Sequence, residues 1–184
     1  MYRLRFLRVM LQSFWSRKRA LHENFPLTFW AIPLLDTDVS RLFTQTYAQY
    51  MGLARWNLVF NSEFRTAALQ RGWTPVTTRE TITYRRSIKA FERVRLVTRI
   101  VHWNAHRFYM EQTFMVRGDV RAVCYVEGVV RGPKGVLSPT DVFRELGVQR
   151  VAPSLPEELR RWVATDKEPS VPRTETASPG GFAG

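Results

Sequence analysis

Two acidic residues stand just ahead of the longest helical pattern in the chain. Asp36 and Asp38 share a short turn-like segment, and apolar residues then recur in three-, four- and seven-residue steps between positions 43 and 58. A carboxylate at such a place can cap the following helix, or it can act as a base or nucleophile. From the residues alone, capping is the stronger interpretation for Asp38, and Asp36 is expected to be a solvated turn residue.

Other side chains with reactive groups are few. The single cysteine, Cys124, lies in an apolar strand-like run, which predicts a buried and inert thiol. His22, His102 and His106 lack the spacing that metal ligands need, so the sequence predicts no metal site. We expect no cofactor.

The elements that must position the acidic pair are one helix and a set of strands. The helical pattern continues to Gly72, a residue type that often follows the last turn, and this predicts one long helix. Residues 24–35 contain Pro26 and Pro33 and predict an edge strand. Hairpin-linked strands, which imply an antiparallel sheet, are expected over 74–88, 93–103, 107–116 and 120–131, and short helices over 138–146 and 157–164.

The charge of the chain is its one unusual bulk property. The 184 residues carry a formal net charge of +12, which favours an anionic partner such as phospholipid, nucleic acid or a phosphate-bearing small molecule. No apolar run approaches the ~20 residues that a membrane-spanning helix requires. We expect a cytoplasmic protein that could also associate with a membrane.

The first twenty residues are basic and amphipathic. Helical spacing gathers one apolar face, formed by Leu4, Leu7, Leu11, Phe14 and Trp15. The opposite side carries Arg5, Arg8, Gln12 and Arg19. Residues 1–20 could lie on an anionic membrane surface, or the helix could pack on its own domain or on a dimer partner. Nucleic-acid binding is not expected, because no base-stacking platform accompanies the basic residues.

Several short motifs resemble one known family. Asp36-Thr37-Asp38, the downstream Tyr47 and the pair Ala54-Arg55 resemble the 4-hydroxybenzoyl-CoA thioesterase-like family. The runs VHWNAHRFYMEQTFMV and VAPSLPEELRRWV resemble its thioesterase superfamily member six group. The resemblance implies the α+β hotdog fold, in which an antiparallel sheet wraps around one long central helix. We divide the chain into an N-terminal amphipathic helix (1–22), a hotdog domain (23–150), a helical extension (151–165) and a disordered tail (166–184).

The resemblance also implies an activity and a set of residues. It predicts an acyl-CoA thioesterase in which Asp38 is the general base or nucleophile, and N–H groups at the start of the long helix form the oxyanion site. Thr44 and Gln45 either bind substrate or cap the helix, and Tyr47 either contacts ligand or packs in the core. Arg85 and Arg86 either meet the coenzyme A phosphates or form a solvated basic face. A homodimer, or a dimer of dimers, is implied as well.

The chain departs from the family pattern at two places. Where the family has His-x-Asn-Asn before the tyrosine, this chain has Arg41 to Thr46 without those groups. Gly52 stands where some members carry a carboxylate in the helix. These departures leave open an alternative function, a catalytically silent hotdog protein that binds acyl groups or acts at a membrane surface.

Overall fold

The structure is a computed structural model that describes residues 2–15, 18–38, 40–147 and 151–164. The chain forms two compact units, Met1–Ser154 and Leu155–Gly184. The second unit contains the helix α5 (Glu157–Ala164), as expected. The tail predicted to be disordered, 166–184, lies outside the described residues.

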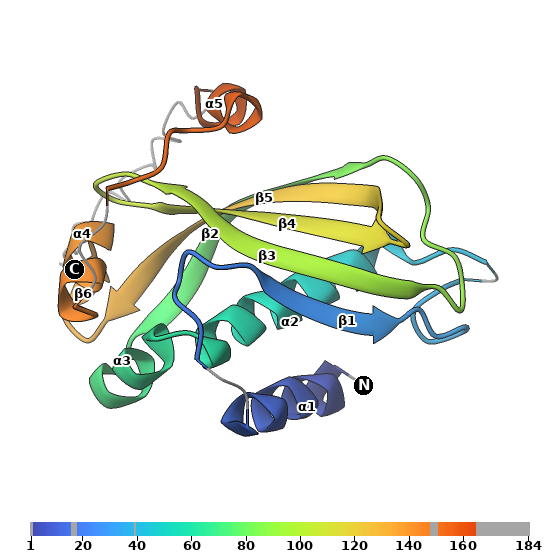
Figure 1. The fold of residues 1–184 in the computed structure, drawn as a ribbon, viewed down its shortest axis with the longest axis horizontal. Helices are drawn as coiled ribbons and strands as arrows, with labels where there is room; N and C mark the ends of the chain where they lie inside the picture. Colours follow the sequence, from blue (N-terminus) through green and yellow to red (C-terminus); the bar gives the residue numbers. More distant parts are fainter. Residues whose placement is uncertain (1, 16–17, 39, 148–150, 165–184) are drawn as a thin grey trace, which may run out of the picture. The chain divides into compact units, whose positions relative to one another are not determined.

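The first unit is built on one antiparallel sheet (Figure 1). Its strands are β1 (Phe25–Trp30), β2 (Thr74–Tyr84), β3 (Arg93–Trp103), β4 (Phe108–Val116), β5 (Asp119–Gly132) and β6 (Gly135–Leu137). The spatial order is β1-β3-β4-β5-β2, and the short β6 pairs with the end of β5. The predicted strands and the edge position of β1 are confirmed. Together they give the α+β hotdog architecture, a curled sheet around a helix.

Local chemistry explains the hairpins well. Arg117 and Gly118 both have positive φ, 53° and 91°, which is the two-residue turn that matches the twist of antiparallel strands. Along β3 the burial alternates, so that Val94 and Leu96 face the core while Arg95 faces solvent. The β4–β5 turn and this alternation together set which side of the sheet faces inward.

The central helix is the place where the expectation was wrong. Instead of one long helix, α2 (Thr44–Asn61) ends at Ser62, whose backbone is extended, and α3 (Phe64–Arg71) follows. The N-cap of α3 is Glu63, and the buried Ser62 hydroxyl before it accepts a hydrogen bond from the Phe64 N–H at 3.3 Å, at the start of the second helix. Gly72 has φ 65° and ends α3 as predicted.

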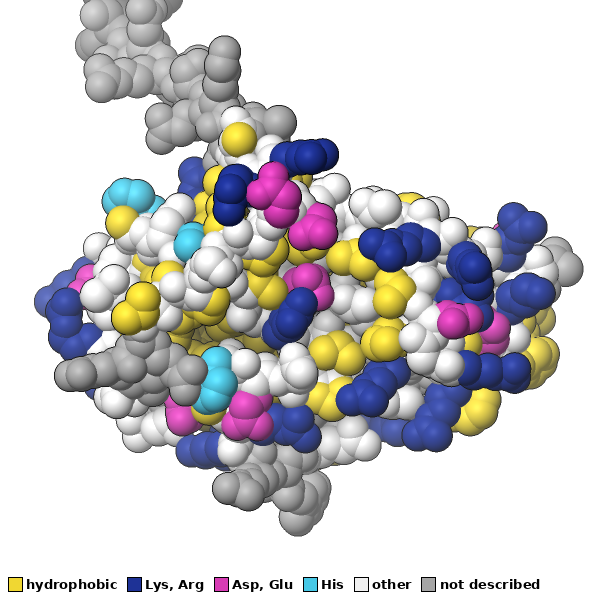
Figure 2. All heavy atoms as spheres, turned by 45° about the horizontal axis from the view of Figure 1, so that its top comes forward, with side chains coloured by type: hydrophobic (Ala, Val, Ile, Leu, Met, Phe, Trp, Pro, Cys, Tyr) yellow, Lys and Arg dark blue, Asp and Glu magenta, His cyan; other side chains and the backbone are white. Residues whose placement is uncertain are grey.

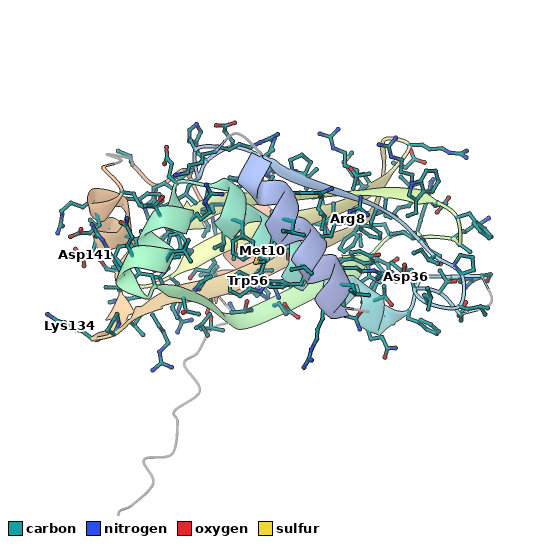
Figure 3. All side chains as sticks on the ribbon, turned by 90° about the horizontal axis from the view of Figure 1, so that it is seen from below. Arg8, Met10, Asp36, Trp56, Lys134 and Asp141 are labelled. Carbon is teal, nitrogen blue, oxygen red and sulfur yellow. The ribbon has the colours of Figure 1, made fainter. Side chains whose placement is uncertain are left out.

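α2 lies against the concave face of the sheet (Figure 1). Its buried residues include Tyr47, Tyr50, Met51, Leu53 and Ala54, and they pack on the inner side chains of β3, β4 and β5. On the side of α2 away from the sheet lies α1 (Tyr2–Trp15), seen in front of it in Figure 3. None of the described helices is long and apolar enough to cross a membrane.

One more helix completes the first unit. α4 (Pro139–Glu145) follows β6 and begins where predicted, because the Ser138 hydroxyl accepts the Asp141 N–H at 3.1 Å. Val142 and Phe143 turn inward from it and close the end of the sheet at which β5 finishes.

Candidate functional site

The two aspartates of the turn have opposite environments. Asp36 is only 1% exposed, and the expectation that it is a solvated turn residue is wrong. The Arg5 guanidinium donates to both of its carboxylate oxygens, Nη1 to Oδ1 at 2.6 Å and Nη2 to Oδ2 at 2.9 Å. The Tyr50 hydroxyl at 3.3 Å and the Ile32 N–H at 3.0 Å also donate to Oδ2. Asp36 is therefore a buried structural carboxylate that joins the turn to α1 and α2.

Burial and the charge of Asp36 shift the pKa values of its partners Tyr50 and Arg5. Burial raises the pKa of Tyr50, and the neighbouring Asp36 charge raises it further, so this hydroxyl stays protonated and remains a donor. For Arg5, burial favours the neutral form, but the hydrogen bond and charge of Asp36 outweigh it and raise the pKa of the guanidinium. The cluster is thus charged and satisfied, and none of its groups is free for catalysis.

Asp38 lies on the surface of the same turn. Its Oδ1 accepts the backbone N–H of Ser40 at 2.8 Å and of Arg41 at 2.7 Å, and these two hydrogen bonds lower the pKa of the carboxyl group. Its Oδ2 has no donor among the described residues. Asp38 is not the N-cap of α2, because that helix begins at Thr44. It is an exposed carboxylate, ionised over a wide pH range, with one oxygen facing solvent.

The first turn of α2 follows the acidic turn and has backbone N–H groups that face solvent. The Phe43 N–H donates to the Asp36 carbonyl at 3.0 Å, so it is not available to a ligand. Thr44 and Gln45 are exposed, and within the described part of the chain no acceptor binds their backbone N–H groups. The positive end of the helix and two N–H groups are therefore open to an anionic oxygen near the turn.

Tyr47 is a core residue. It is 4% exposed, and its ring meets the rings of Tyr84 and Phe114 at centroid distances of 5.0 Å each. Burial raises its pKa. These contacts give Tyr47 a packing role at the start of α2.

The predicted arginines lie at the same end of the sheet as the turn. Arg85 and Arg86 are exposed just after β2, and both backbone N–H groups donate to the Arg121 carbonyl. The Arg86 side chain reaches Asp119 at 3.9 Å. The segment after β2 is tied to the acidic turn, because the Ala90 N–H donates to the Ser40 carbonyl at 3.1 Å. Figure 2 shows Lys and Arg side chains gathered at this end, the right-hand end of the view.

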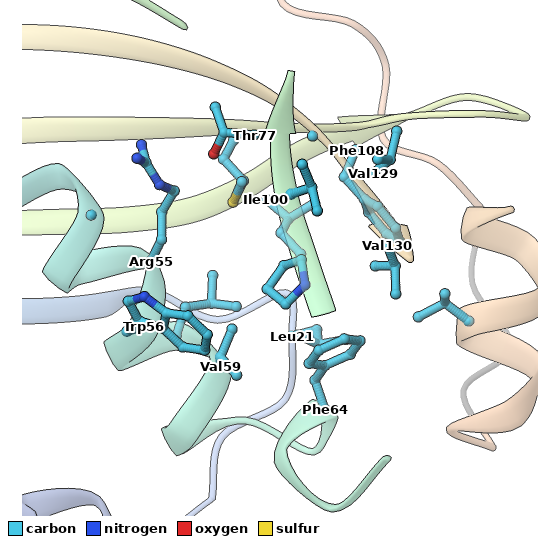
Figure 4. Close-up of a pocket in the computed structure, with 17 residues that line it drawn as sticks. Leu21, Arg55, Trp56, Val59, Phe64, Thr77, Ile100, Phe108, Val129 and Val130 are labelled. Atoms are coloured by element: carbon cyan, nitrogen blue, oxygen red, sulfur yellow. The ribbon is translucent and has the colours of Figure 1, made fainter. Parts of the chain in front are cut away.

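A cavity of about 280 Å³ lies beside the second half of α2, well away from that turn (Figure 4). Its walls are mostly apolar and come from both helices and sheet, and they include Trp56, Val59, Phe64, Ile100, Phe108 and Val130. Gly52 forms the part of the wall nearest the start of α2. At 1.5 Å per residue, Gly52 lies ~12 Å along the helix from Thr44. None of the predicted site residues is among the described residues that line the cavity.

A polar cluster borders the cavity, and sequence reasoning missed most of it. Arg55, which lines the cavity, pairs with Glu80 at 3.0 Å and donates to the Gln112 side-chain oxygen at 3.3 Å. Gln112 is fully buried and donates to the Met51 carbonyl and the Thr98 hydroxyl. A glutamine on the inner side of an alternating strand was the available signal, because a buried amide must find partners.

Cys124 matches its prediction. It is fully buried, and burial raises the pKa of the thiol to about 12, which makes it a poor nucleophile. In the described part of the chain, His, Cys, Asp and Glu side chains form no group of three or more that could hold a metal ion.

Comparison with known proteins identifies the family of the chain. Residues 32–163 match the thioesterase-like superfamily. The chain belongs to that superfamily. It is 37% identical to Protein THEM6 of Danio rerio over 87 residues, covering 45% of this chain and 41% of the relative. It is 29% identical to Protein THEM6 of Xenopus laevis over 136 residues, covering 71% and 64%. The matched part thus spans less than two thirds of either relative.

Solved structures agree on the fold of this superfamily member. YbaW of Escherichia coli, described as a probable thioesterase, aligns with a TM-score of 0.59 at 18% identity, covering 68% of this chain and 96% of its own. A Staphylococcus aureus protein solved in complex with CoA, SAV2348, aligns with a TM-score of 0.60 at 11% identity, covering 76% and 93%. At these identities the likeness establishes the hotdog fold.

Proposed function

We propose that this protein hydrolyses acyl-CoA thioesters at the end of the sheet that carries Asp38. The observation that carries the proposal is the contrast between the two aspartates of the turn. Asp36 is neutralised by Arg5, whereas Asp38 keeps an ionised carboxylate at the surface beside the start of α2. Membership of the thioesterase-like superfamily supports acyl thioester hydrolysis as the reaction.

The proposed roles follow from the chemistry of a thioester. The Asp38 carboxylate either removes a proton from an attacking water, or attacks the carbonyl carbon itself and forms an anhydride that water then hydrolyses. In both routes the C–S bond breaks and the thiolate of coenzyme A leaves. The N–H groups of Thr44 and Gln45 would receive the carbonyl oxygen as negative charge develops on it. Arg85 and Arg86 are proposed to contact the phosphates of coenzyme A, because they lie at the same end of the sheet.

The apolar cavity supports an acyl group as the other half of the substrate. Gly52 marks the part of the cavity nearest the turn, and the far end of the acyl chain is proposed to lie there. The ~12 Å between these points favours a long aliphatic chain over a short acyl group. Trp56, Ile100 and Val130 offer such a chain an apolar lining.

A homodimer, or a dimer of dimers, forms part of the proposal. β1 and β2 are the outer strands of the main sheet, and β2 has exposed residues on both faces. Edge strands with unpaired backbone groups can join a second copy by continuing the sheet. Measurement of the mass in solution by light scattering tests this part of the proposal.

The second candidate is an acyl-binding protein without hydrolase activity. It is favoured by the separation between Asp38 and the cavity, and by the lack of a side chain at Gly52. Thiol release from acyl-CoAs of different chain lengths, compared between wild type and Asp38→Asn, separates the two. Turnover that depends on Asp38 supports the thioesterase, and tight acyl-CoA binding with no turnover supports the silent protein.

A further inference from the structure

The inner side of α1 fixes how this helix is rotated on the domain. Arg5 points inward to the buried Asp36, and the ring of Phe6 meets that of Trp56 edge-on at 5.7 Å. Val9, on the same side, is 4% exposed. An ion pair and an aromatic contact on one side leave the helix no freedom to turn over. Its opposite side therefore belongs to the outer surface.

That outer side is apolar, which is unexpected for a helix already packed on its own domain. Leu4, Leu7 and Leu11 follow one another at three- and four-residue steps, and they are 70%, 44% and 45% exposed. By the helical spacing, the exposed Arg3 and Arg8 flank this leucine stripe on its two sides. Leucines in the middle and arginines along both margins are the arrangement of a helix lying in a membrane interface.

A groove next to the leucine stripe adds a place for an anion. It has a volume of about 440 Å³, lies between α1 and β1, and is lined by Arg8, Arg93 and the 59% exposed Trp30, among others. Arg5 also lines it, but Asp36 already balances that charge. In the described part of the chain, neither Arg8 nor Arg93 forms an ion pair. Figure 3 shows Arg8 on the side of α1 that faces β1, where the groove lies.

We propose that the outer face of α1, together with this groove, binds the surface of an anionic phospholipid membrane. The three leucines would enter the acyl boundary, and Trp30 would lie at the depth of the headgroups, where tryptophan is favoured. Arg8 and Arg93 would meet lipid phosphates in the groove. An anionic surface gains about fivefold in affinity from each arginine near it.

The charge of this face favours a lipid surface over a second copy of the chain as its partner. Residues 1–20 contain six basic residues after Met1 and no acidic one. A symmetric contact between two copies of α1 would place like-charged margins together, without acidic residues on that face to offset them. An anionic lipid surface instead complements Arg3, Arg8 and Arg93 at once.

Vesicle sedimentation with the full chain tests the proposal. We expect binding to vesicles of phosphatidylcholine with phosphatidylserine, little binding to phosphatidylcholine alone, and weaker binding as salt increases. The triple variant Leu4→Gln, Leu7→Gln, Leu11→Gln should lose at least tenfold in affinity. Arg8→Gln with Arg93→Gln should lose about 25-fold on anionic vesicles.

Matched controls come from other exposed positions. Leu69→Gln, at a 75% exposed leucine of α3, and Arg131→Gln, at an exposed arginine of β5, should leave vesicle binding unchanged. Circular dichroism verifies that each variant folds. Equal binding by wild type and the triple variant would overturn the proposal, as would absence of wild-type binding to anionic vesicles. Self-association that the triple variant abolishes, without vesicle binding, would assign the leucine stripe to a protein interface instead.

Discussion

Arg5 and Asp36, 31 residues apart in the chain, form a two-point ion pair with N–O distances of 2.6 and 2.9 Å. The carboxylate is 1% exposed, so its charge depends on this partner. The pair joins α1 to the turn that also carries Asp38. The same ion pair therefore stabilises the turn and attaches α1 to the domain.

Loss of Arg5 should destabilise the whole unit. In Arg5→Ala the Asp36 carboxylate stays buried without its cation, and we expect the free energy of unfolding to fall by about 3 kcal/mol or more. Urea denaturation followed by tryptophan fluorescence measures it. Arg8→Ala, on the same helix but without an ion pair in the described part of the chain, is the control and should change stability by less than about 0.5 kcal/mol. Similar values for the two variants would contradict a structural role for the pair.

Removal of the Asp38 charge should abolish turnover without affecting the fold. Because the side chain is exposed, Asp38→Asn should unfold at the wild-type temperature and yet hydrolyse acyl-CoA at least about 100-fold more slowly. Thiol release at saturating substrate measures the rate. Asp119→Asn, another exposed aspartate at the same end of the sheet, is the control and should keep activity. Equal rates for wild type and Asp38→Asn would place the chemistry elsewhere.

The pH profile should carry the signature of the same residue. Hydrogen bonds from Ser40 and Arg41 lower the pKa of Asp38, so the carboxylate stays ionised to a lower pH than an ordinary aspartate does. The acid limb of kcat/KM should therefore fall below the ordinary aspartate value of about 3.9. A limb near neutral pH would instead indicate a different base.

A side chain at Gly52 should shorten the preferred acyl chain. Gly52→Leu places four carbons in the part of the cavity nearest the turn, and turnover of long-chain acyl-CoAs should fall relative to short ones. Gln49→Leu adds the same side chain at an exposed position of α2 and should leave the profile unchanged. Identical chain-length profiles for both leucine variants would show that the acyl chain does not occupy the cavity.

The buried thiol should make the protein less stable at alkaline pH. An unfolded cysteine ionises near pH 8.5, whereas folded Cys124 keeps its proton to about pH 12. The folded state therefore binds more protons across this window, and stability falls as pH rises. Between pH 8 and 10 the loss should be about 2 kcal/mol greater for wild type than for Cys124→Ala. Parallel stability curves for the two proteins would contradict the burial of the thiol.

The strands could be predicted from the sequence because their signals are local. Alternation along β3 and the Arg117-Gly118 turn need no knowledge of distant residues. The break at Ser62 was missed because apolar spacing continues across it, and only the hydroxyl of Ser62 marks the new start. Helical periodicity indicates which side of a helix is buried, and α2 buries Tyr47, Tyr50, Met51, Ala54 and Leu58 as the spacing predicts.

The site was harder to predict, because its environment comes from distant parts of the chain. Asp36 and Asp38 look alike in sequence, and what separates them is Arg5, a residue of another helix. The cavity is formed by residues that any apolar core would contain, so their types carry no signal. Of the residues that line the cavity, Gly52 alone was a signal in the sequence, because a glycine inside a helix indicates that space is left beside it.

The order of the strands has a consequence for how the domain folds. β3, β4 and β5 form a meander of neighbours, whereas β1 and β2, which precede and follow α2 in sequence, join opposite edges of it. The chain between them must cross the concave face from edge to edge (Figure 1). Local hairpins close early and distant pairings late, so the meander should acquire protected amides before α2 does in pulsed hydrogen exchange. The turn with Asp38 would then be among the last parts of the molecule to take shape.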